Sequence, residues 1–134
     1  MQVSNVTGPI SAQTGGGSVE VSNVPRELTL RTGGGAIKIH GQTGRISAET
    51  AGGNILVGSS AGAQLQSGGG SIQVTQCGSH LKASTAGGSI EVGHVKGSAL
   101  LQTGGGNIRV GGAGGVVTAT TGGGTIELFK LMDV

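Results

Sequence analysis

Apolar residues return along this chain at a fixed distance, in pairs separated by one polar or variable residue. Alternation of apolar and polar positions over a short run predicts a β-strand with one buried face. The first member of each pair is Val19, Ile37, Ile55, Ile72, Ile90, Ile108 or Ile126, and the second is Val21, Ile39, Val57, Val74, Val92, Val110 or Leu128.

A second, shorter strand is predicted in each repeat, again from alternating positions. A polar bend, usually with a glycine, separates the two strands, and Pro9 and Pro25 fall in this bend, where a missing backbone N–H is tolerated. The inward residues of the second strand are Ile10 and Ala12, Leu28 and Leu30, Ile46 and Ala48, Ala63 and Leu65, Leu81 and Ala83, Ala99 and Leu101, and Val117 and Ala119.

Each second strand leads into a Thr-Gly-Gly-Gly turn or a close variant. The turns begin at Thr14, Thr32, Thr50, Ser67, Thr85, Thr103 and Thr121, with a spacing of 18 residues except for 17 between Thr50 and Ser67. Two strands and two turns per repeat are typical of a solenoid, whose stacked coils bury a core that no single coil buries alone. We therefore predict one domain over residues 1–134, an all-β parallel β-solenoid (β-helix) of about seven 18-residue coils. The pattern leaves open its handedness and whether the chain is a piece of a longer solenoid.

The glycines of the turns differ in how strictly they recur. The first is replaced by Ala51 and Ala86, whereas the other two recur in every copy. Glycine makes a protein less stable than alanine does, by roughly 0.5–1 kcal/mol, at positions where either residue fits. A glycine that recurs in every copy therefore needs a structural reason. We expect either a positive φ or a collision between a Cβ and the neighbouring coil. On that reasoning Gly69→Val should destabilise far more than Ala51→Gly. A glycine ridge that packs closely against a neighbour is the alternative. The strict positions are Gly16, Gly17, Gly34, Gly35, Gly52, Gly53, Gly69, Gly70, Gly87, Gly88, Gly105, Gly106, Gly123 and Gly124.

Two further columns support the stacked arrangement. Two residues before each Thr or Ser, small and large residues alternate without exception, which lets a leucine fill the space beside two alanines. The sequence of this column is Ala12, Leu30, Ala48, Leu65, Ala83, Leu101, Ala119. On the outside of the first strand, opposite charges should meet on neighbouring coils, at Glu20 with Lys38 and at Arg109 with Glu91 and Glu127.

Composition and charge exclude several functions. The 134 residues include 31 glycines, one phenylalanine and no tryptophan or tyrosine, and the net charge of +2 is scattered. We expect no nucleic-acid partner because there is no basic stripe, and no membrane span because no apolar run approaches about 18 residues. The scarcity of aromatic residues disfavours sugar stacking, and a single inward threonine column disfavours ice binding.

No group of residues suggests catalysis. The carboxylates fall at different positions of different coils, so we expect no acid pair, no metal cluster and no enzyme activity. Cys77 aligns with apolar positions and should lie in the core. No turn has the Lys-Ser/Thr of a phosphate-binding loop. We expect no catalytic, cofactor-binding or metal site, no cofactor and no small-molecule substrate. The carboxylates are Glu20, Glu27, Glu49, Glu91, Glu127 and Asp133, and the histidines, expected to be solvated turn residues, are His40, His80 and His94.

The two ends of the predicted solenoid are candidate interfaces between copies. A solenoid exposes unpaired strand edges at both ends, and this chain shows no capping helix. Truncation of a longer chain, a local apolar cap and stacking onto another copy are all compatible with this pattern. The end-interface candidates are Met1, Val3, Leu128, Phe129, Leu131 and Met132.

The repeat also resembles a known family. The stretch 46–57, with Gly52-Gly53-Asn54-Ile55, and the similar Gly105-Gly106-Asn107-Ile108 are similar to a family of bacterial glycine-rich β-solenoid domains of unknown function that are classed as adhesins. The usual Ser-Gly-Asp of that family is replaced in the other turns. The resemblance implies a cell-envelope β-solenoid with no catalytic residues.

Three functions remain open from the sequence. The first is a non-catalytic module that self-associates, as a homo-oligomer or fibre, in a bacterial surface fibre or envelope layer. The second is an adhesin-type module that binds a surface partner with one lateral face. The third is an intracellular polymerising scaffold similar to the bactofilins. We identify no signal peptide before the first predicted strand. A signal peptide upstream in the gene would argue against the third function, because it would direct the protein out of the cytoplasm. The expected location is extracellular or in the cell envelope.

Overall fold

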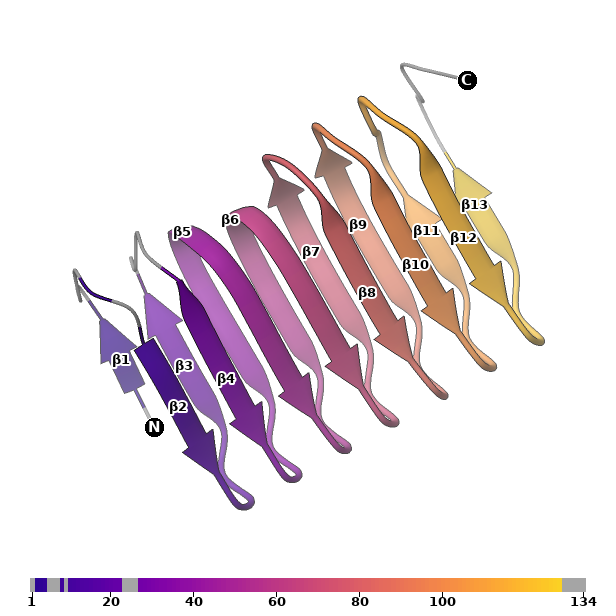
Figure 1. Cartoon of the computed structure of the whole chain (residues 1–134). Coiled ribbons are helices and arrows are strands. Elements are labelled where there is room, and N and C mark those ends of the chain that lie inside the picture. The colour runs from indigo at the N-terminus through magenta and orange to yellow at the C-terminus, as the bar shows by residue number, and fades with distance from the viewer. Residues whose placement is uncertain (1, 5–7, 9, 23–26, 129–134) are drawn as a thin grey trace.

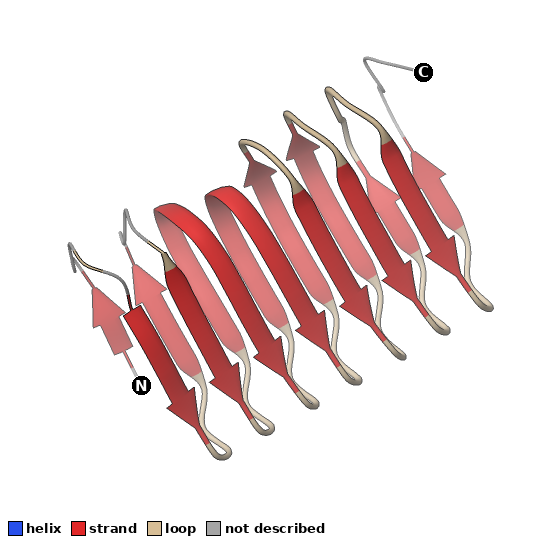
Figure 2. Cartoon of the chain, viewed as in Figure 1, coloured by secondary structure: helices blue, strands red, loops and turns tan. Residues whose placement is uncertain are grey.

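The computed structural model describes residues 2–4, 8, 10–22 and 27–128 of the chain. Among them are thirteen strands and no helix (Figures 1 and 2). Met1, Pro9, Pro25, Phe129, Leu131 and Met132 lie outside the described residues. The strands are β1 (Gln2–Ser4), β2 (Ile10–Thr14), β3 (Val19–Ser22), β4 (Leu28–Thr32), β5 (Ile37–Thr50), β6 (Ile55–Ser67), β7 (Ile72–Cys77), β8 (Leu81–Thr85), β9 (Ile90–Val95), β10 (Ala99–Thr103), β11 (Ile108–Val110), β12 (Val117–Thr121) and β13 (Ile126–Leu128).

The strands form a flattened rod with two layers (Figure 1). The back face follows the order β1-β3-β5-β6-β7-β9-β11-β13, and the front face contains β2, β4, β8, β10, β12 and the second halves of β5 and β6. Every pairing between strands is parallel, which confirms the predicted parallel β-solenoid. The described residues wind through about six turns, and parts of the outermost coils are not described.

The register between coils follows the repeat. Val19 pairs with Ile37, and Ile90 pairs with Ile108, each 18 residues along. The single 17-residue step lies at the edge opposite the Thr-Gly-Gly turns, where the β5–β6 register shifts between Ile39 and Gln42. Both strands there run continuously around that edge, whereas the neighbouring coils break into two strands (Figure 2). The missing residue is therefore absorbed without disturbing the columns on either face.

The core lies between the two layers and consists of the predicted inward columns. The side chains of the back-face column from Val19 to Ile108 are almost completely buried, as are those of the front-face column from Leu28 to Ala99. Cys77 is also buried and pairs with Val95, which confirms its predicted place in the core. The paired strands within each layer join residues 17 or 18 apart in sequence, as expected for a stack of coils.

The front layer of the core alternates large and small side chains in two directions. Leu101 pairs with Ala83 on one side and Ala119 on the other, so the predicted alternation along the rod is confirmed. Within a coil the neighbouring inward position shows the opposite size, as in Ala99 beside Leu101. Only β4, with Leu28 and Leu30, has two large residues among these strands. This checkerboard keeps the core dense without enlarging any coil.

The predicted charge column is confirmed in its register and only partly in its contacts. Arg109 pairs with Glu91 and Glu127, and its Nε lies 3.3 Å from the Glu127 carboxylate. Glu20 and Lys38 also lie in register, but these two described side chains form no ion pair. An exposed pair contributes at most about 1 kcal/mol.

Candidate functional site

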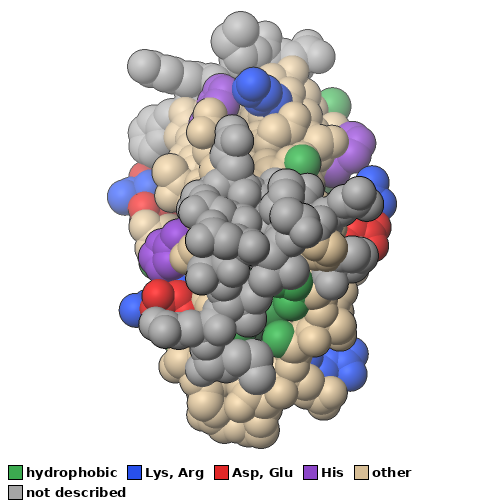
Figure 3. Space-filling model, turned by 90° about the vertical axis from the view of Figure 1, so that its left-hand side faces the viewer, with side chains coloured by type: hydrophobic (Ala, Val, Ile, Leu, Met, Phe, Trp, Pro, Cys, Tyr) green, Lys and Arg blue, Asp and Glu red, His purple; other side chains and the backbone are tan. Residues whose placement is uncertain are grey.

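The Thr-Gly-Gly turns form one long edge of the rod, which we call the glycine edge. It comprises the turns at residues 15–18, 33–36, 51–54, 68–71, 86–89, 104–107 and 122–125. In the end-on view of Figure 3, charged and histidine side chains lie on the two lateral sides and near the top, and none is visible at the lower corner, where these turns lie in Figure 1. The glycine edge is therefore an uncharged surface of backbone and small polar side chains, such as Asn107 and Thr125, between two charged faces.

Buried threonines tie the coils together at this edge. The Thr32 hydroxyl donates to the carbonyl of Gly17 in the preceding coil at 2.9 Å and accepts from the Gly35 N–H of its own turn at 3.2 Å. The same pair of bonds recurs at Thr50, Ser67, Thr85, Thr103 and Thr121. The predicted inward threonine column is confirmed, and the structure adds its role as a hydrogen-bond ladder, which the apolar pattern alone does not indicate.

The third glycine of each turn is required by the coil before it. A Cβ at Gly70 would meet the carbonyl oxygen and carbon of Gly53 and would lie 2.9 Å from the Asn54 nitrogen. The same collision with backbone atoms recurs at Gly35, Gly53, Gly88, Gly106 and Gly124. Backbone atoms on a paired coil cannot move aside without breaking the stack, so the predicted collision explains this glycine.

The second glycine has no such requirement, which corrects the argument from sequence. A Cβ at Gly69 would have nothing within 4 Å, and no turn glycine has a φ in the left-handed region. The reason for expecting Gly69→Val to be severe therefore fails at Gly69 and applies to Gly70. The first glycine is also less permissive than Ala51 suggests, because a Cβ at Gly68 would meet the Ala51 carbonyl oxygen. Nothing in the structure explains why the second glycine recurs in every turn.

A second column of small residues lies inside the opposite edge. Ser60 pairs with Cys77, whose thiol donates to the carbonyl of His80 at 3.4 Å. The Ser60 hydroxyl is buried and has no hydrogen-bond partner among the described residues. This contrasts with the threonine ladder, where each buried hydroxyl has both a donor and an acceptor.

Replacing Ser60 by alanine is expected to raise the free energy of unfolding by about 1 kcal/mol, because an unpaired buried hydroxyl costs roughly 1–3 kcal/mol and its removal leaves little empty space. Urea unfolding of Ser60→Ala beside the wild type measures the difference. Thr103→Val is the control, since it removes a hydroxyl of the ladder and should lower stability. If both variants lost the same amount of stability, the Ser60 hydroxyl would have to form a hydrogen bond in the folded protein.

The described histidine, cysteine and carboxylate side chains form no cluster of potential metal ligands. His40, His80 and His94 are exposed, and the described part of the chain holds no group of three His, Cys, Asp or Glu residues close enough to share a metal ion. Sequence reasoning missed one ion pair, in which the Arg31 guanidinium lies 3.8 Å from the Glu49 carboxylate on the front face. No described segment forms a helix that could span a membrane.

The last described coil presents core side chains to solvent. Ile126 is 41% and Leu128 is 40% exposed, whereas Ile108 and Val110 at the equivalent positions one coil earlier are fully buried. Among the described strands, β13 pairs only with β11, and β12 pairs only with β10. At the other end Val3 lies in β1, which pairs only with β3, opposite Val21. Of the predicted end-interface residues, Val3 and Leu128 are thus in terminal strands, and the other four are outside the described residues.

Two grooves run along the front face. One, of about 820 Å³, follows the glycine edge and includes the paired Arg31 and Glu49. The other, of about 740 Å³, lies toward the opposite edge and includes Arg45, Lys82 and Leu100. In the first groove a basic and an acidic side chain lie close together, whereas all the charged residues that line the second groove are basic. The two grooves therefore suit different ligands.

Comparison of the chain with protein-family models, with curated proteins and with solved structures found no match. The chain is thus placed by its fold, a parallel β-solenoid, and the adhesin-like resemblance stays an interpretation of the repeat.

Proposed function

We propose that this chain is a non-catalytic structural module that self-associates end to end through its terminal coils. The observation that carries the proposal is the exposure of Ile126 and Leu128 at positions whose counterparts in the earlier coils are buried. Apolar surface removed from water contributes roughly 25 cal/mol per Å². A further coil placed on β12 and β13 would bury this surface and pair the free strand edges.

The first strand of a second copy is suited to extend the back face. Continuing the back-face register would place Leu128 against Val3, and both residues are apolar. Because β1 precedes β2 and β12 precedes β13 along the chain, β2 of that copy would stand two coils beyond β12, with one front-strand position open between them. The contact that carries the association is therefore on the back face, at Leu128.

The test is the mass of the protein in solution over a range of concentrations, measured by sedimentation or light scattering. We expect the wild type to form species larger than one chain, and Leu128→Lys to shift the equilibrium to single chains because a charge would enter the interface. Leu100→Lys is the matched control, since Leu100 is 43% exposed on the lateral face. Single chains at every concentration in the wild type, or equal behaviour of the two variants, would refute end-to-end association.

The cellular setting of such an assembly rests on the repeat pattern. The resemblance to bacterial envelope domains supports a surface fibre or envelope layer as the place where the module is used. Fractionation of the native bacterium, followed by detection of the full-length gene product, tests this part separately. Recovery from the cytoplasm would favour the intracellular scaffold instead.

A lateral binding module is the second candidate, and the basic groove on the front face is the observation that favours it. This function does not exclude assembly, because the groove follows the outward face of the front strands and association uses the strand edges, although Val116 and Thr118 at one end of the groove belong to the terminal coil.

A further inference from the structure

Exposed large apolar side chains outside the end of the rod are confined to one place. Among the described residues, only Leu100 and Val116 are large, apolar and exposed on the lateral surface, at 43% and 65%. Both line the basic groove of about 740 Å³ on the front face. An apolar pair within a groove is a more specific signal than a scattered leucine, which is common on protein surfaces.

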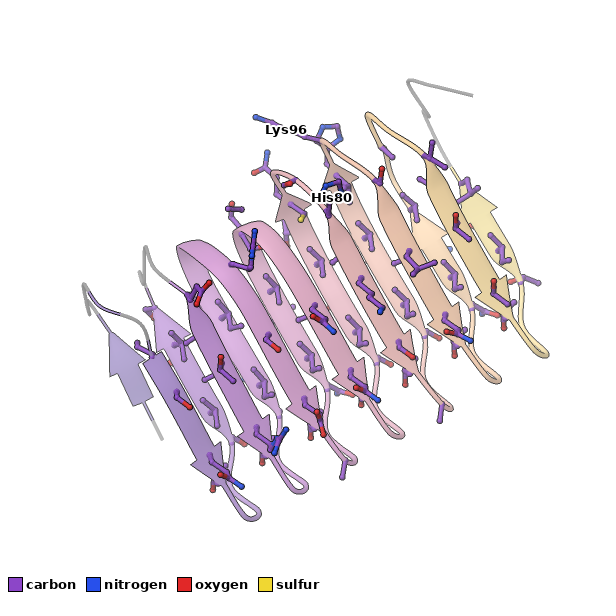
Figure 4. All side chains as sticks on the ribbon, viewed as in Figure 1. His80 and Lys96 are labelled. Atoms are coloured by element: carbon purple, nitrogen blue, oxygen red, sulfur yellow. The ribbon has the colours of Figure 1, made fainter. Side chains whose placement is uncertain are left out.

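The floor of the groove is low because one coil lacks side chains there. Gly62 pairs with Arg45 in the coil before, and it precedes Ala63, whose N–H donates to the His80 carbonyl of the coil after at 3.0 Å. Strands stack at about 4.8 Å, so Arg45 and His80 stand about 10 Å apart on either side of Gly62. Figure 4 shows His80 at the upper turns, just before β8. The gap is one coil wide and open to solvent.

The charge of the groove has a single sign. Arg45, His80 and Lys82 contribute to its lining, and no Asp or Glu does. The carboxylate nearest by register, Glu27, stands one coil before Arg45 and forms no ion pair with it among the described residues. Carboxylates placed between Arg45 and Lys82 would therefore meet positive charge on both sides, and Glu27 would lie outside the groove, beyond Arg45.

We propose that this groove binds an extended acidic peptide segment that also carries a bulky apolar side chain. The acidic residues would lie over Gly62, between Arg45 and Lys82, and the apolar side chain over Leu100 and Val116. Those two regions are separated by two to three coils, on the order of 12 Å, which an extended peptide spans in about three or four residues.

The remaining lining residues favour a peptide over other anions. Ser47, Gln64 and Thr118 line the groove and can bond the N–H and C=O groups of a peptide backbone. An acyl chain would leave these polar groups without partners. The proposal goes beyond self-association and does not depend on it, because the groove lies on the side of the rod.

The experiment measures fluorescence anisotropy of a labelled synthetic peptide, Ser-Glu-Glu-Ser-Ser-Leu-Ser, with the full chain at concentrations where its mass is that of one chain. We expect saturable binding that weakens when NaCl rises from about 50 mM to about 500 mM. Lys82→Ser should raise the Kd about fivefold. Gly62→Val should abolish binding without unfolding, since a Cβ there would meet only the His80 oxygen at an ordinary 3.6 Å.

The matched control is Lys38→Ser, which removes the same charge from an exposed position on the back face and should leave the Kd unchanged. Peptides with Gln for Glu, or with Ser for Leu, should bind more weakly than the parent. The proposal is overturned by absent binding, by equal binding of the altered peptides, or by equal effects of Lys82→Ser and Lys38→Ser. Binding to phosphatidylglycerol vesicles in place of the peptide would also overturn it and assign the groove to a lipid surface. If the chain did not self-associate, the sedimentation or light-scattering measurement would show it, and the peptide-binding result would be unaffected.

Discussion

Gly70→Ala is expected to lower the free energy of unfolding by about 3 kcal/mol or more, a large change for a single methyl group. The added Cβ would collide with the Gly53 carbonyl and with the backbone at Asn54, both in the preceding coil. Neither atom belongs to a flexible side chain, so relief requires the two coils to separate at this corner. Separation would also break the bond from the Ser67 hydroxyl to the Gly53 carbonyl. Urea unfolding followed by circular dichroism measures the loss, and a broadened transition would indicate that the two halves of the stack unfold separately.

Gly69→Ala, one residue earlier, is the matched control for this collision. A Cβ at Gly69 would have nothing within 4 Å, and the φ there is outside the left-handed region. Alanine also restricts the unfolded chain more than glycine does, so we expect a gain of about 0.4–1 kcal/mol. If Gly69→Ala destabilised as much as Gly70→Ala, the collision would not be the reason for the glycine turn.

The fold could be predicted because one period governs the whole chain. A residue such as Ile90 repeats its environment at Ile72 and Ile108, so the apolar alternation within a coil and the 18-residue spacing between coils specify the same arrangement. The inward place of Cys77 followed from the same columns. Parallel stacking needs no further information, since only that arrangement buries every apolar column at once.

The roles of individual turn residues could not be predicted in the same way. Gly69 and Gly70 are equally strict in the sequence, yet only a Cβ at Gly70 would point into the preceding coil. That direction depends on the backbone path through the corner, which composition does not specify. The threonine ladder was missed for a related reason, because Thr85 bonds to a glycine 15 residues away, outside the 18-residue register.

The basic groove was open to sequence reasoning but was not found by it. Its lining comes from the outward columns of the second strand, whereas the predicted charge pairs lie in the outward column of the first strand. Aligning the residue before each inward position brings Arg45, Gly62, His80 and Val116 into one row. Columns of polar residues are more variable than apolar ones, so such a row is informative only after the inward columns have fixed the register.

Leu101→Ala is expected to lower the free energy of unfolding by about 3–5 kcal/mol, in the upper part of the range for buried leucines. Leu101 is fully buried, and its partners in the neighbouring coils are Ala83 and Ala119. Three consecutive alanines would leave a cavity that none of them can fill. The measurement is urea unfolding, with adjacent Leu100→Ala as the control, because that side chain points outward and its loss should change stability by no more than about 0.5 kcal/mol.

The double variant Ala99→Leu with Leu101→Ala separates alternation from simple volume. It keeps the composition of the coil, but it places a leucine at position 99 between Leu81 and Val117 and leaves alanine between Ala83 and Ala119. If the checkerboard matters, one column is overfilled and the other is empty, so the double variant should remain at least about 2 kcal/mol less stable than the wild type. Recovery to wild-type stability would mean that the core requires only a total volume per coil, and that the alternation between coils contributes nothing to the stability of the stack.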